Sequence, residues 1–224
     1  MSILYVTATP IGNLEDITLR AIRILGEVDF ILCEDTRVTR KLLSHFEIKT
    51  PTISYHSNSK IDKMEKIIEL LEEGKNLALV SDAGTPAISD PGVQLIEKIR
   101  EKLPETKILT VPGASALTAA ISISGAPTAR FQFLGFLPHK KGRETIFKEI
   151  SASDETVIFY ESPHRIMKTL ESLVLHAPEK NITIARELTK IYENVVIGKP
   201  AEVLAHYDEN QEEIRGEFVV IVSE

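Results

Sequence analysis

The stretch that decides the fold is residues 81–92, which read Ser81-Asp82-Ala83-Gly84-Thr85-Pro86-Ala87-Ile88-Ser89-Asp90-Pro91-Gly92. A short apolar run at 76–80 precedes it and is typical of a buried parallel strand. Apolar residues at helical spacing follow over 91–103, with Asp90 as the expected N-cap and Pro91 at the first helical position. Ligands of open α/β sheets bind beyond the carboxyl ends of such strands, so this loop is a candidate site. An ordinary surface loop is the alternative.

The same alternation of strand and helix continues on both sides of this stretch. The first half predicts a mostly parallel sheet, whereas the second half has longer strands and possible hairpins that favour a mixed sheet. We therefore expect an α/β fold of two domains, 1–112 and 113–224. The strands are expected at 3–7, 30–33, 52–55, 77–80, 108–111, 131–137, 156–160, 182–185, 193–197 and 218–222, and the main helices at 17–26, 60–73, 91–103, 142–150, 164–175 and 200–207.

Composition limits the class of protein. The 224 residues are 43% hydrophobic, which is enough for a substantial core, and the net charge of -7 argues against loose, non-specific nucleic-acid binding. A local basic patch stays possible. The single cysteine, Cys33, excludes an internal disulfide framework. The sequence has neither a signal-peptide pattern nor an apolar run near the ~20 residues of a membrane span, so we expect a cytoplasmic protein.

Several common chemistries lack their motifs. The chain contains no G-x-G pair, no phosphate-binding Walker loop and no G-x-S-x-G nucleophile elbow. Its six histidines are scattered and without a cysteine cluster, so we expect no metal. What remains is a set of loops at strand ends, and these have a recognisable order.

The strand-end motifs resemble those of the bacterial ribosomal RNA small-subunit cytidine 2′-O-methyltransferases, which belong to the tetrapyrrole-methylase-like superfamily. The match covers nearly the whole chain in family order. It rests on 9–18 (TPIGNLEDIT), 33–37 (CEDTR), 81–86 (SDAGTP), 111–116 (VPGASA), 135–138 (GFLP), 160–165 (YESPHR) and 185–190 (ARELTK).

The resemblance implies a function and its partners. The implied methyl donor is S-adenosyl-L-methionine, bound in a cleft between two α/β domains of the tetrapyrrole-methylase type. The implied substrate is 16S rRNA within the 30S subunit, methylated on the ribose 2′-hydroxyl of a cytidine near the decoding centre by a homodimer. The ribose oxygen would attack the sulfonium methyl in one in-line displacement.

Candidate donor-site residues follow from the strand-end loops and the resemblance. A helix opening after 112–115 would favour a carboxylate such as the methionine tail, and the residues after the strand 156–160 would meet the adenine. The alternatives are turn capping for Asp82, helix capping for Ser115, core packing for the residues after 156–160 and a buried pair for Arg186 and Glu187. The donor-binding set is Pro10, Asp82, Ala83, Gly84, Thr85, Ser89, Gly113, Ala114, Ser115, Phe159, Tyr160, Glu161 and Arg186.

A general base and a set of RNA contacts complete the expected site. We choose Glu187 as the catalytic base because it ends a strand beside Arg186, although Asp35, Glu161 and Lys190 are alternatives. Three basic runs are candidates for phosphate contact, with a solvated surface as the other interpretation. They contain Arg37, Arg40 and Lys41, then Lys140, Lys141 and Arg143, then His164 and Arg165.

Two other functions fit the same sequence. A tetrapyrrole C-methyltransferase would use the same donor pocket on a free porphyrinoid and would need no basic surface. A nucleotide-binding module for ribosome assembly would bind the donor without turnover. Activity on small substrates alone would select the first, and donor binding without methyl transfer would select the second.

Overall fold

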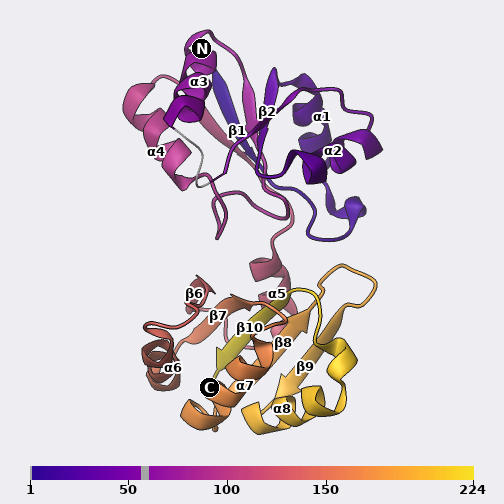
Figure 1. Ribbon diagram of the computed structural model, residues 1–224, viewed down its shortest axis with the longest axis vertical. Helices are drawn as coiled ribbons and strands as arrows, with labels where there is room; N and C mark the ends of the chain where they lie inside the picture. The colour runs from indigo at the N-terminus through magenta and orange to yellow at the C-terminus, as the bar shows by residue number, and fades with distance from the viewer. Residues whose placement is uncertain (1, 57–60) are drawn as a thin grey trace. The chain divides into compact units, whose positions relative to one another are not determined.

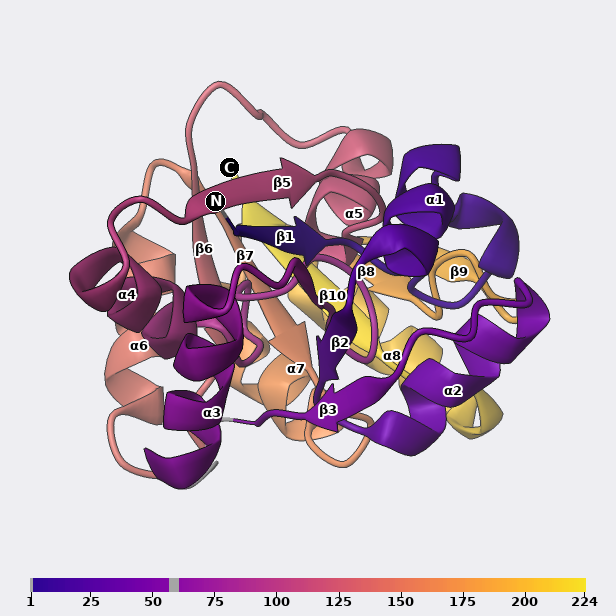
Figure 2. The ribbon, with the colours of Figure 1, turned by 90° about the horizontal axis from the view of Figure 1, so that it is seen from above.

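The computed structural model describes residues 2–56 and 61–224, and it divides into two compact units, Met1–Ser115 and Ala116–Glu224. The division falls close to the boundary expected at 112. Each unit contains one five-stranded sheet with helices packed on it (Figures 1 and 2). The start of the helix expected at 60–73 lies outside the described residues.

The first unit is built on an entirely parallel sheet in the order β3-β2-β4-β1-β5. Its strands are β1 (Ile3–Thr7), β2 (Phe30–Cys33), β3 (Thr52–Ser54), β4 (Leu77–Leu79) and β5 (Lys107–Val111). The central strand β4 is fully buried between β1 and β2, as its short apolar run predicted.

Helices cover both faces of this sheet. They are α1 (Leu19–Glu27), α2 (Thr36–His45), α3 (Ile61–Glu72) and α4 (Val93–Lys102). One hydrophobic cluster joins the sheet to α3 and α4, and another joins it to α1 and α2. Figure 2 shows the two pairs of helices on opposite sides of the strands. The chain therefore leaves β1 and β2 toward one face and β4 toward the other.

Local capping explains where these helices begin, with one correction. The Thr18 side chain accepts a hydrogen bond from Ala21 N and starts α1, and Asp35 accepts one from Arg37 N and starts α2. The prediction that Asp90 caps the next helix is wrong. Gly92, at φ 142°, holds the N-cap of α4, and no side chain caps this helix by a hydrogen bond.

The second unit has the mixed sheet that the sequence predicted, in the order β6-β7-β10-β8-β9. Only β6 and β7 are parallel, and the predicted β8–β9 hairpin is present. The strands are β6 (Phe131–Phe136), β7 (Thr156–Glu161), β8 (Asn181–Arg186), β9 (Asn194–Gly198) and β10 (Phe218–Ser223), and the helices are α5 (Ala116–Ser124), α6 (Arg143–Ala152), α7 (Ile166–His176) and α8 (Pro200–Glu209).

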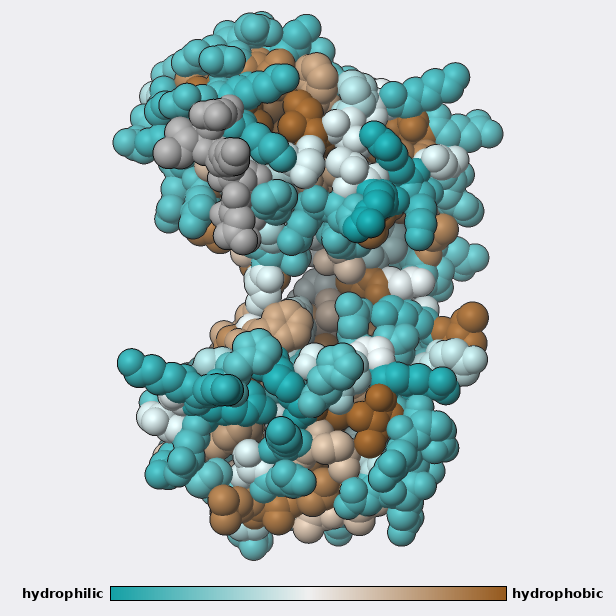
Figure 3. Space-filling view, viewed as in Figure 1, coloured by the Kyte–Doolittle hydropathy of each residue, from teal (hydrophilic) through white to brown (hydrophobic). Residues whose placement is uncertain are grey.

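The core of this unit lies between the sheet and helices α6, α7 and α8. Phe147, Phe159, Tyr207 and Phe218 are its largest buried side chains. Figure 3 shows a mostly hydrophilic surface over these helices, with small hydrophobic areas between the polar side chains. Among the residues described, no helix has the length and apolar character needed to cross a membrane.

Candidate functional site

Four of the predicted site loops meet at one edge of the first sheet. They follow β2, β4, β1 and β5, which are neighbours in that order, and all lie at carboxyl ends because the sheet is parallel. The chain runs from β4 to one face and from β1 and β2 to the other. Such a reversal opens a crevice at the strand ends, which is where ligands of open α/β sheets bind.

The loops after β1 and β4 are joined directly. Thr9 and Gly84 exchange two backbone hydrogen bonds, of 2.9 and 3.1 Å. The Thr9 hydroxyl donates to Ser81 O at 3.2 Å, and the Ser81 hydroxyl donates to Gly84 O at 3.0 Å. Both hydroxyl side chains are buried, so this part of the loop is a fixed platform.

The loop after β5 packs closely against this platform. The Thr85 hydroxyl donates to Ala114 O at 3.2 Å. A Cβ on Gly113 would lie 3.0 Å from Ala8 Cβ, and one on Gly84 would lie 3.2 Å from the Ile11 methyl group. Gly84 also has a φ of 82°, which side-chain-bearing residues rarely adopt. Glycine therefore favours the close approach of the loops at both positions, because an added Cβ would crowd a neighbouring side chain.

Asp82 connects the platform to the loop after β2. Its Oδ1 accepts a hydrogen bond from Asp35 N at 3.1 Å. Asp35 in turn forms an ion pair with Arg37 at 2.6 Å, and hydrogen bonds from Arg37 lower the pKa of the Asp35 carboxyl to about 2. Asp82 therefore holds a neighbouring loop, the one after β2, by this hydrogen bond, whereas the alternative interpretation expected it to cap its own turn.

Carboxylates gather at this edge. Burial, followed by the nearby charge of Glu34, raises the pKa of Asp90 to about 6. Burial and the charge of Asp82 also raise the pKa of Glu34. Ala87 and Ser89, which lie between Asp82 and Asp90 in the sequence, have φ of 66° and 61°, an unusual conformation for residues with a side chain. The edge is therefore negatively charged and conformationally strained, a combination common at functional sites.

The donor-site residues predicted in the first unit thus come from loops that meet at this edge. Asp82, Ala83, Ser89 and Gly113 are exposed, and Thr85, Ala114 and Ser115 are half-buried. Pro10 and Gly84 are buried beneath them. Sequence reasoning left Thr9, Ser81 and Asp90 out of the site, although the hydroxyl and carboxyl groups in a turn-rich loop were the available signal.

The donor-site residues predicted in the second unit have other surroundings. Phe159 is part of the hydrophobic core, and Tyr160 packs edge-on against Phe133 and Phe136 at 5.0 and 5.4 Å. The Glu161 side chain is fully buried and pairs with Arg143 and Arg165. The structure therefore gives the Phe159 side chain a core-packing role and the Glu161 side chain an ion-pairing role.

Arg186 and Glu187 do not pair with each other as the alternative interpretation expected. Arg186 is 4% exposed, and its Nε and Nη1 atoms have no hydrogen-bond partner within the described part of the chain. Glu187 Oε1 accepts hydrogen bonds from Lys190 Nζ at 2.7 Å and from Glu217 N at 3.0 Å. Burial raises the pKa of Glu187, but these hydrogen bonds outweigh it and the net pKa lies below its usual value.

The predicted RNA contacts separate into exposed residues, among them Arg37 with its ion pair to Asp35, and two arginines engaged inside the second unit. Six of the eight side chains belong to exposed residues, whereas Arg143 and Arg165 are only 14% and 15% exposed and bind Glu161. The interpretation of these two arginines as phosphate contacts therefore needs revision, since their guanidinium groups are used inside the unit. The six exposed residues are Arg37, Arg40, Lys41, Lys140, Lys141 and His164.

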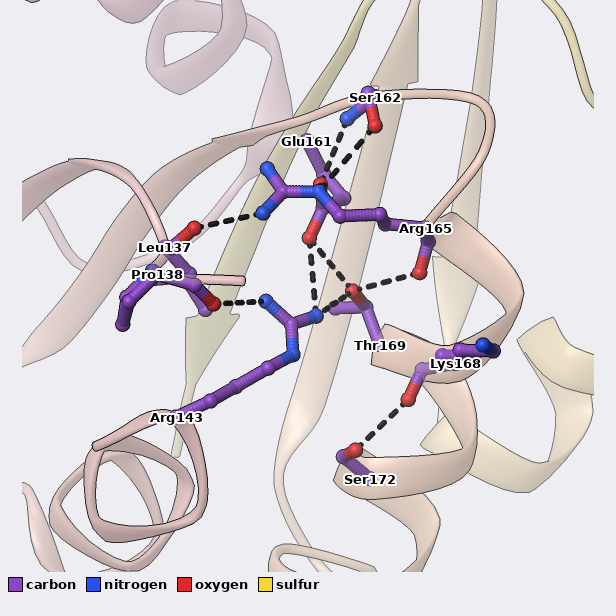
Figure 4. A network of polar contacts seen from close by, with 9 residues as sticks. All are labelled: Leu137, Pro138, Arg143, Glu161, Ser162, Arg165, Lys168, Thr169 and Ser172. Carbon is purple, nitrogen blue, oxygen red and sulfur yellow. Dashed lines mark hydrogen bonds and ion pairs between the residues drawn. The ribbon is translucent and has the colours of Figure 1, made fainter. Parts of the chain in front are cut away.

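Arg143 and Arg165, which were predicted as RNA contacts, share the Glu161 carboxylate as a partner, as Figure 4 shows. Their charge suggested a surface role. Glu161 lies 18 residues beyond Arg143, a separation that no spacing rule links, and four residues before Arg165. Within residues 2–56 and 61–224 no three histidine, cysteine, aspartate or glutamate side chains form a group that could hold a metal ion.

Known proteins share both the sequence and the fold. The profile of the Tetrapyrrole (Corrin/Porphyrin) Methylases matches residues 4–204. Proteins named ribosomal RNA small subunit methyltransferase I are similar over nearly the whole chain. The one from Halalkalibacterium halodurans is 48% identical over 98% of this chain and 75% of its own, and that from Thermotoga maritima is 42% identical over 100% and 99%.

Solved structures add a likeness of fold at low identity. Cobalt precorrin-4 methyltransferase CbiF superposes with a TM-score of 0.68 at 16% identity, over 99% of this chain and 94% of that one. Uroporphyrin-III C-methyltransferase from Thermus thermophilus, in complex with S-adenosylhomocysteine, gives 0.65 at 18% identity, over 100% and 98%. The chain belongs to the tetrapyrrole (corrin/porphyrin) methylase family and, within it, to the group of proteins named ribosomal RNA small subunit methyltransferase I.

Proposed function

We propose that this protein methylates the ribose 2′-hydroxyl of a cytidine in 16S rRNA, near the decoding centre of the 30S subunit, with S-adenosyl-L-methionine as donor. The observation that carries the proposal is the 42–48% identity, over nearly the full chain, to proteins named as ribosomal RNA small subunit methyltransferases. We place this activity in the cytoplasm and assign it to a homodimer.

The strand-end loops of the first unit fit the donor chemically. The donor carries a sulfonium and an ammonium, and the carboxylates of Glu34, Asp82 and Asp90 complement positive charge. It carries no phosphate, so the missing glycine-rich phosphate cradle is no objection. Gly84 and Gly113 carry no side chain that could keep a ligand away from the backbone. An added Cβ at these positions would lie 3.2 Å and 3.0 Å from neighbouring side chains.

Particular residues are assigned to hold the donor. Asp82 would accept hydrogen bonds from ribose hydroxyls or the ammonium, and the small residues Ala83, Thr85 and Ser89 would line the pocket. The backbone N–H groups that open α5 after Ser115 would favour the donor carboxylate. Pro10, Gly113 and Ala114 shape the floor.

The main task of the chain is to position its substrates. When bound, the donor supplies an already activated methyl group, so holding the ribose oxygen in line accounts for much of the acceleration. Glu187 is our candidate for accepting the 2′-hydroxyl proton. Its lowered pKa keeps the carboxylate ionised at neutral pH, which is the form a base needs, although it also makes Glu187 a weaker base.

RNA binding to an acidic protein needs local positive charge. With a net charge of -7, the chain would repel RNA in bulk, so exposed clusters must provide phosphate contacts. Arg37, Arg40 and Lys41 form one cluster on α2. Lys140 and Lys141 form another before α6, with His164 exposed near the start of α7. Specificity would come from an unpaired or extruded nucleotide.

One experiment tests the whole proposal. The protein is incubated with 30S subunits lacking the modification and with donor labelled in its methyl group, and the labelled nucleotide is mapped. We expect label on the 2′-oxygen of one cytidine in 16S rRNA. Label that appears only on free porphyrinoids would assign the tetrapyrrole reaction instead, and donor binding without transfer to either substrate would contradict an enzymatic role on the ribosome.

A further inference from the structure

Glu161 is a fully buried carboxylate that binds two arginines at once. Its Oε1 forms an ion pair with Arg165 Nε at 2.7 Å, and its Oε2 accepts a hydrogen bond from Arg143 Nη2 at 3.1 Å. Its oxygens also accept hydrogen bonds from Thr169 Oγ1 and from Ser162 N, both at 2.8 Å. Figure 4 shows both guanidinium groups converging on this one side chain at the end of β7.

The outer ends of both guanidinium groups bind the chain between β6 and α6. Arg165 Nη1 donates to Leu137 O at 2.7 Å, and Arg143 Nη1 donates to Pro138 O at 3.3 Å. The backbone N–H of Arg143 also donates to Lys140 O at 3.2 Å. Two consecutive carbonyl groups are therefore held by side chains that are themselves fixed by a single buried anion.

The segment held in this way is basic and exposed. We call residues 138–142 the basic loop, because it presents His139, Lys140 and Lys141 to solvent. It enters from the buried Leu137 and ends at Gly142, whose φ of 83° turns the chain into α6. Arg143, the first residue of that helix, packs its guanidinium over the Phe147 ring at 5.2 Å.

Stability alone is a poor reason for this arrangement. Buried ion pairs are often no more stabilising than well-packed hydrophobic side chains of the same volume. A hydrophobic replacement could fill the space, but it could not hold the Leu137 and Pro138 carbonyls. The planar guanidinium fork binds one partner at each edge, so it fixes the direction of the loop relative to β7 and α7.

We propose that Glu161, Arg143 and Arg165 are positioning residues that hold the basic loop so that Lys140 and Lys141 meet RNA phosphates. The inference rests on the proposed function, since RNA is the polyanion in question. It replaces direct phosphate contact by Arg143 and Arg165 with an indirect role. The two roles make different predictions. A direct phosphate contact would contribute binding free energy independently of Lys140 and Lys141, whereas a positioning residue would contribute only through these two lysines.

The first test measures the loop itself. Arg165→Lys keeps the positive charge but loses the fork that reaches Leu137 O. We expect backbone NMR order parameters at 139–142 to fall from the rigid range, about 0.85, to below about 0.6, while those of β7 and β8 stay unchanged. Lys168→Ala, at an exposed position of α7, is the control and should leave the loop rigid. Unchanged order parameters in the Arg165 variant would overturn the proposal.

The second test is a double-mutant cycle on RNA binding. Replacing Lys140 and Lys141 with alanine removes two contacts, so the slope of log affinity against log salt should fall by about 1.4–1.8. Arg165→Lys alone should weaken binding of 30S subunits by about tenfold. In the Lys140→Ala, Lys141→Ala background, Arg165→Lys should have no further effect. An equal loss in both backgrounds would mean direct contact or general damage, and it would overturn the positioning role.

Two further arms separate the possible failures. If Arg165→Lys does not fold, Arg143→Lys is used in the same cycle, because it loses the Pro138 O contact and keeps the charge. If the wild type methylates 30S subunits while the Lys140→Ala, Lys141→Ala variant keeps full affinity and an unchanged salt slope, that result would overturn the role of the basic loop and leave the proposed function intact. Wild-type protein that transfers no methyl group to 30S subunits would overturn the proposed function instead.

Discussion

Thr9 and Gly84 exchange both of their backbone hydrogen bonds, with Thr9 N to Gly84 O at 2.9 Å and Gly84 N to Thr9 O at 3.1 Å. This antiparallel bridge joins the loop after β1 to the loop after β4, two strands that are themselves paired in parallel. The candidate donor site therefore begins as a rigid continuation of the sheet and not as two separate flexible loops. Its geometry leads to the first prediction.

Gly84→Ala should destabilise the first unit and weaken donor binding. The left-handed backbone conformation alone costs about 1–2 kcal/mol with a side chain present. The new methyl group would also meet the Ile11 side chain at 3.2 Å. Gly74→Ala is the matched control, since its φ of 84° is similar and it has open space around it. Urea unfolding and calorimetric donor titration should show a larger loss for Gly84→Ala, and equal losses would contradict the role of crowding.

Thr85→Val should weaken donor binding with little change in overall stability. The substitution keeps the shape of the side chain but removes the 3.2 Å hydrogen bond to Ala114 O, an interaction whose net contribution is about 1 kcal/mol. The loop after β5 would then be less well fixed against the platform. Thr110→Val, at an exposed position of β5, should leave donor affinity unchanged in the same titration. A normal dissociation constant for Thr85→Val would argue against this loop as part of the site.

The stability contribution of Asp90 should decrease as pH rises. Its pKa in the folded protein, about 6, lies above the ordinary value of 3.8, so the folded state holds this proton more tightly. The contribution is fully present below about pH 4 and is lost as pH rises through about 6. The difference in unfolding free energy between wild type and Asp90→Asn should therefore fall across this window and then stay level.

Urea titrations at several pH values between 4 and 8 measure that difference for Asp90. Asp16→Asn, at an exposed position, is the control and should give a flat difference over the same range. A wild-type advantage over Asp90→Asn that grows between pH 4 and 6 would have the wrong sign. It would mean that the ionised carboxylate is stabilised at this position and that burial does not dominate.

Glu161→Gln should be strongly destabilising, by about 3–5 kcal/mol, because it leaves two buried guanidinium groups without their countercharge. Glu144→Gln on α6 breaks an ion pair with Lys148 whose side chains are 64% and 72% exposed, and it should change stability by less than about 1 kcal/mol. Thermal and chemical unfolding of both variants checks this contrast. A similarly small loss of stability in both variants would show that Glu161 and its two arginine partners are effectively solvated.

Glu187→Gln should lower the rate of methyl transfer by about 100-fold or more while donor affinity stays normal, if Glu187 accepts the hydroxyl proton. The amide can still accept the hydrogen bond from Lys190, so the local fold should survive. Glu217→Gln is the control, since Glu217 is the second carboxylate partner of Lys190 and is 75% exposed. Full transfer by Glu187→Gln with normal donor affinity would remove Glu187 as the base.

The sequence by itself determined the order of elements, the parallel and mixed character of the two sheets, and the loops that carry the site. These are local signals: the buried run in β4, the turn residues of 81–92 and the apolar spacing of α1 each act over a few neighbouring residues. The full-length motif series also identified the family, because its members share the order of those loops.

Only the tertiary structure decided which polar groups are partners. Gly92 and not Asp90 holds the N-cap of α4, and Glu187 pairs with Lys190 and not with Arg186. Arg143 and Arg165 turn from the expected surface contacts into ligands of one buried carboxylate. The physical reason is that a charged side chain is paired or exposed according to what the fold brings within about 3 Å of it. Some of these partners are far away in sequence, as Arg143 is from Glu161, and others are near but lie across a turn whose geometry the residue pattern does not give, as Lys190 and Glu187 do.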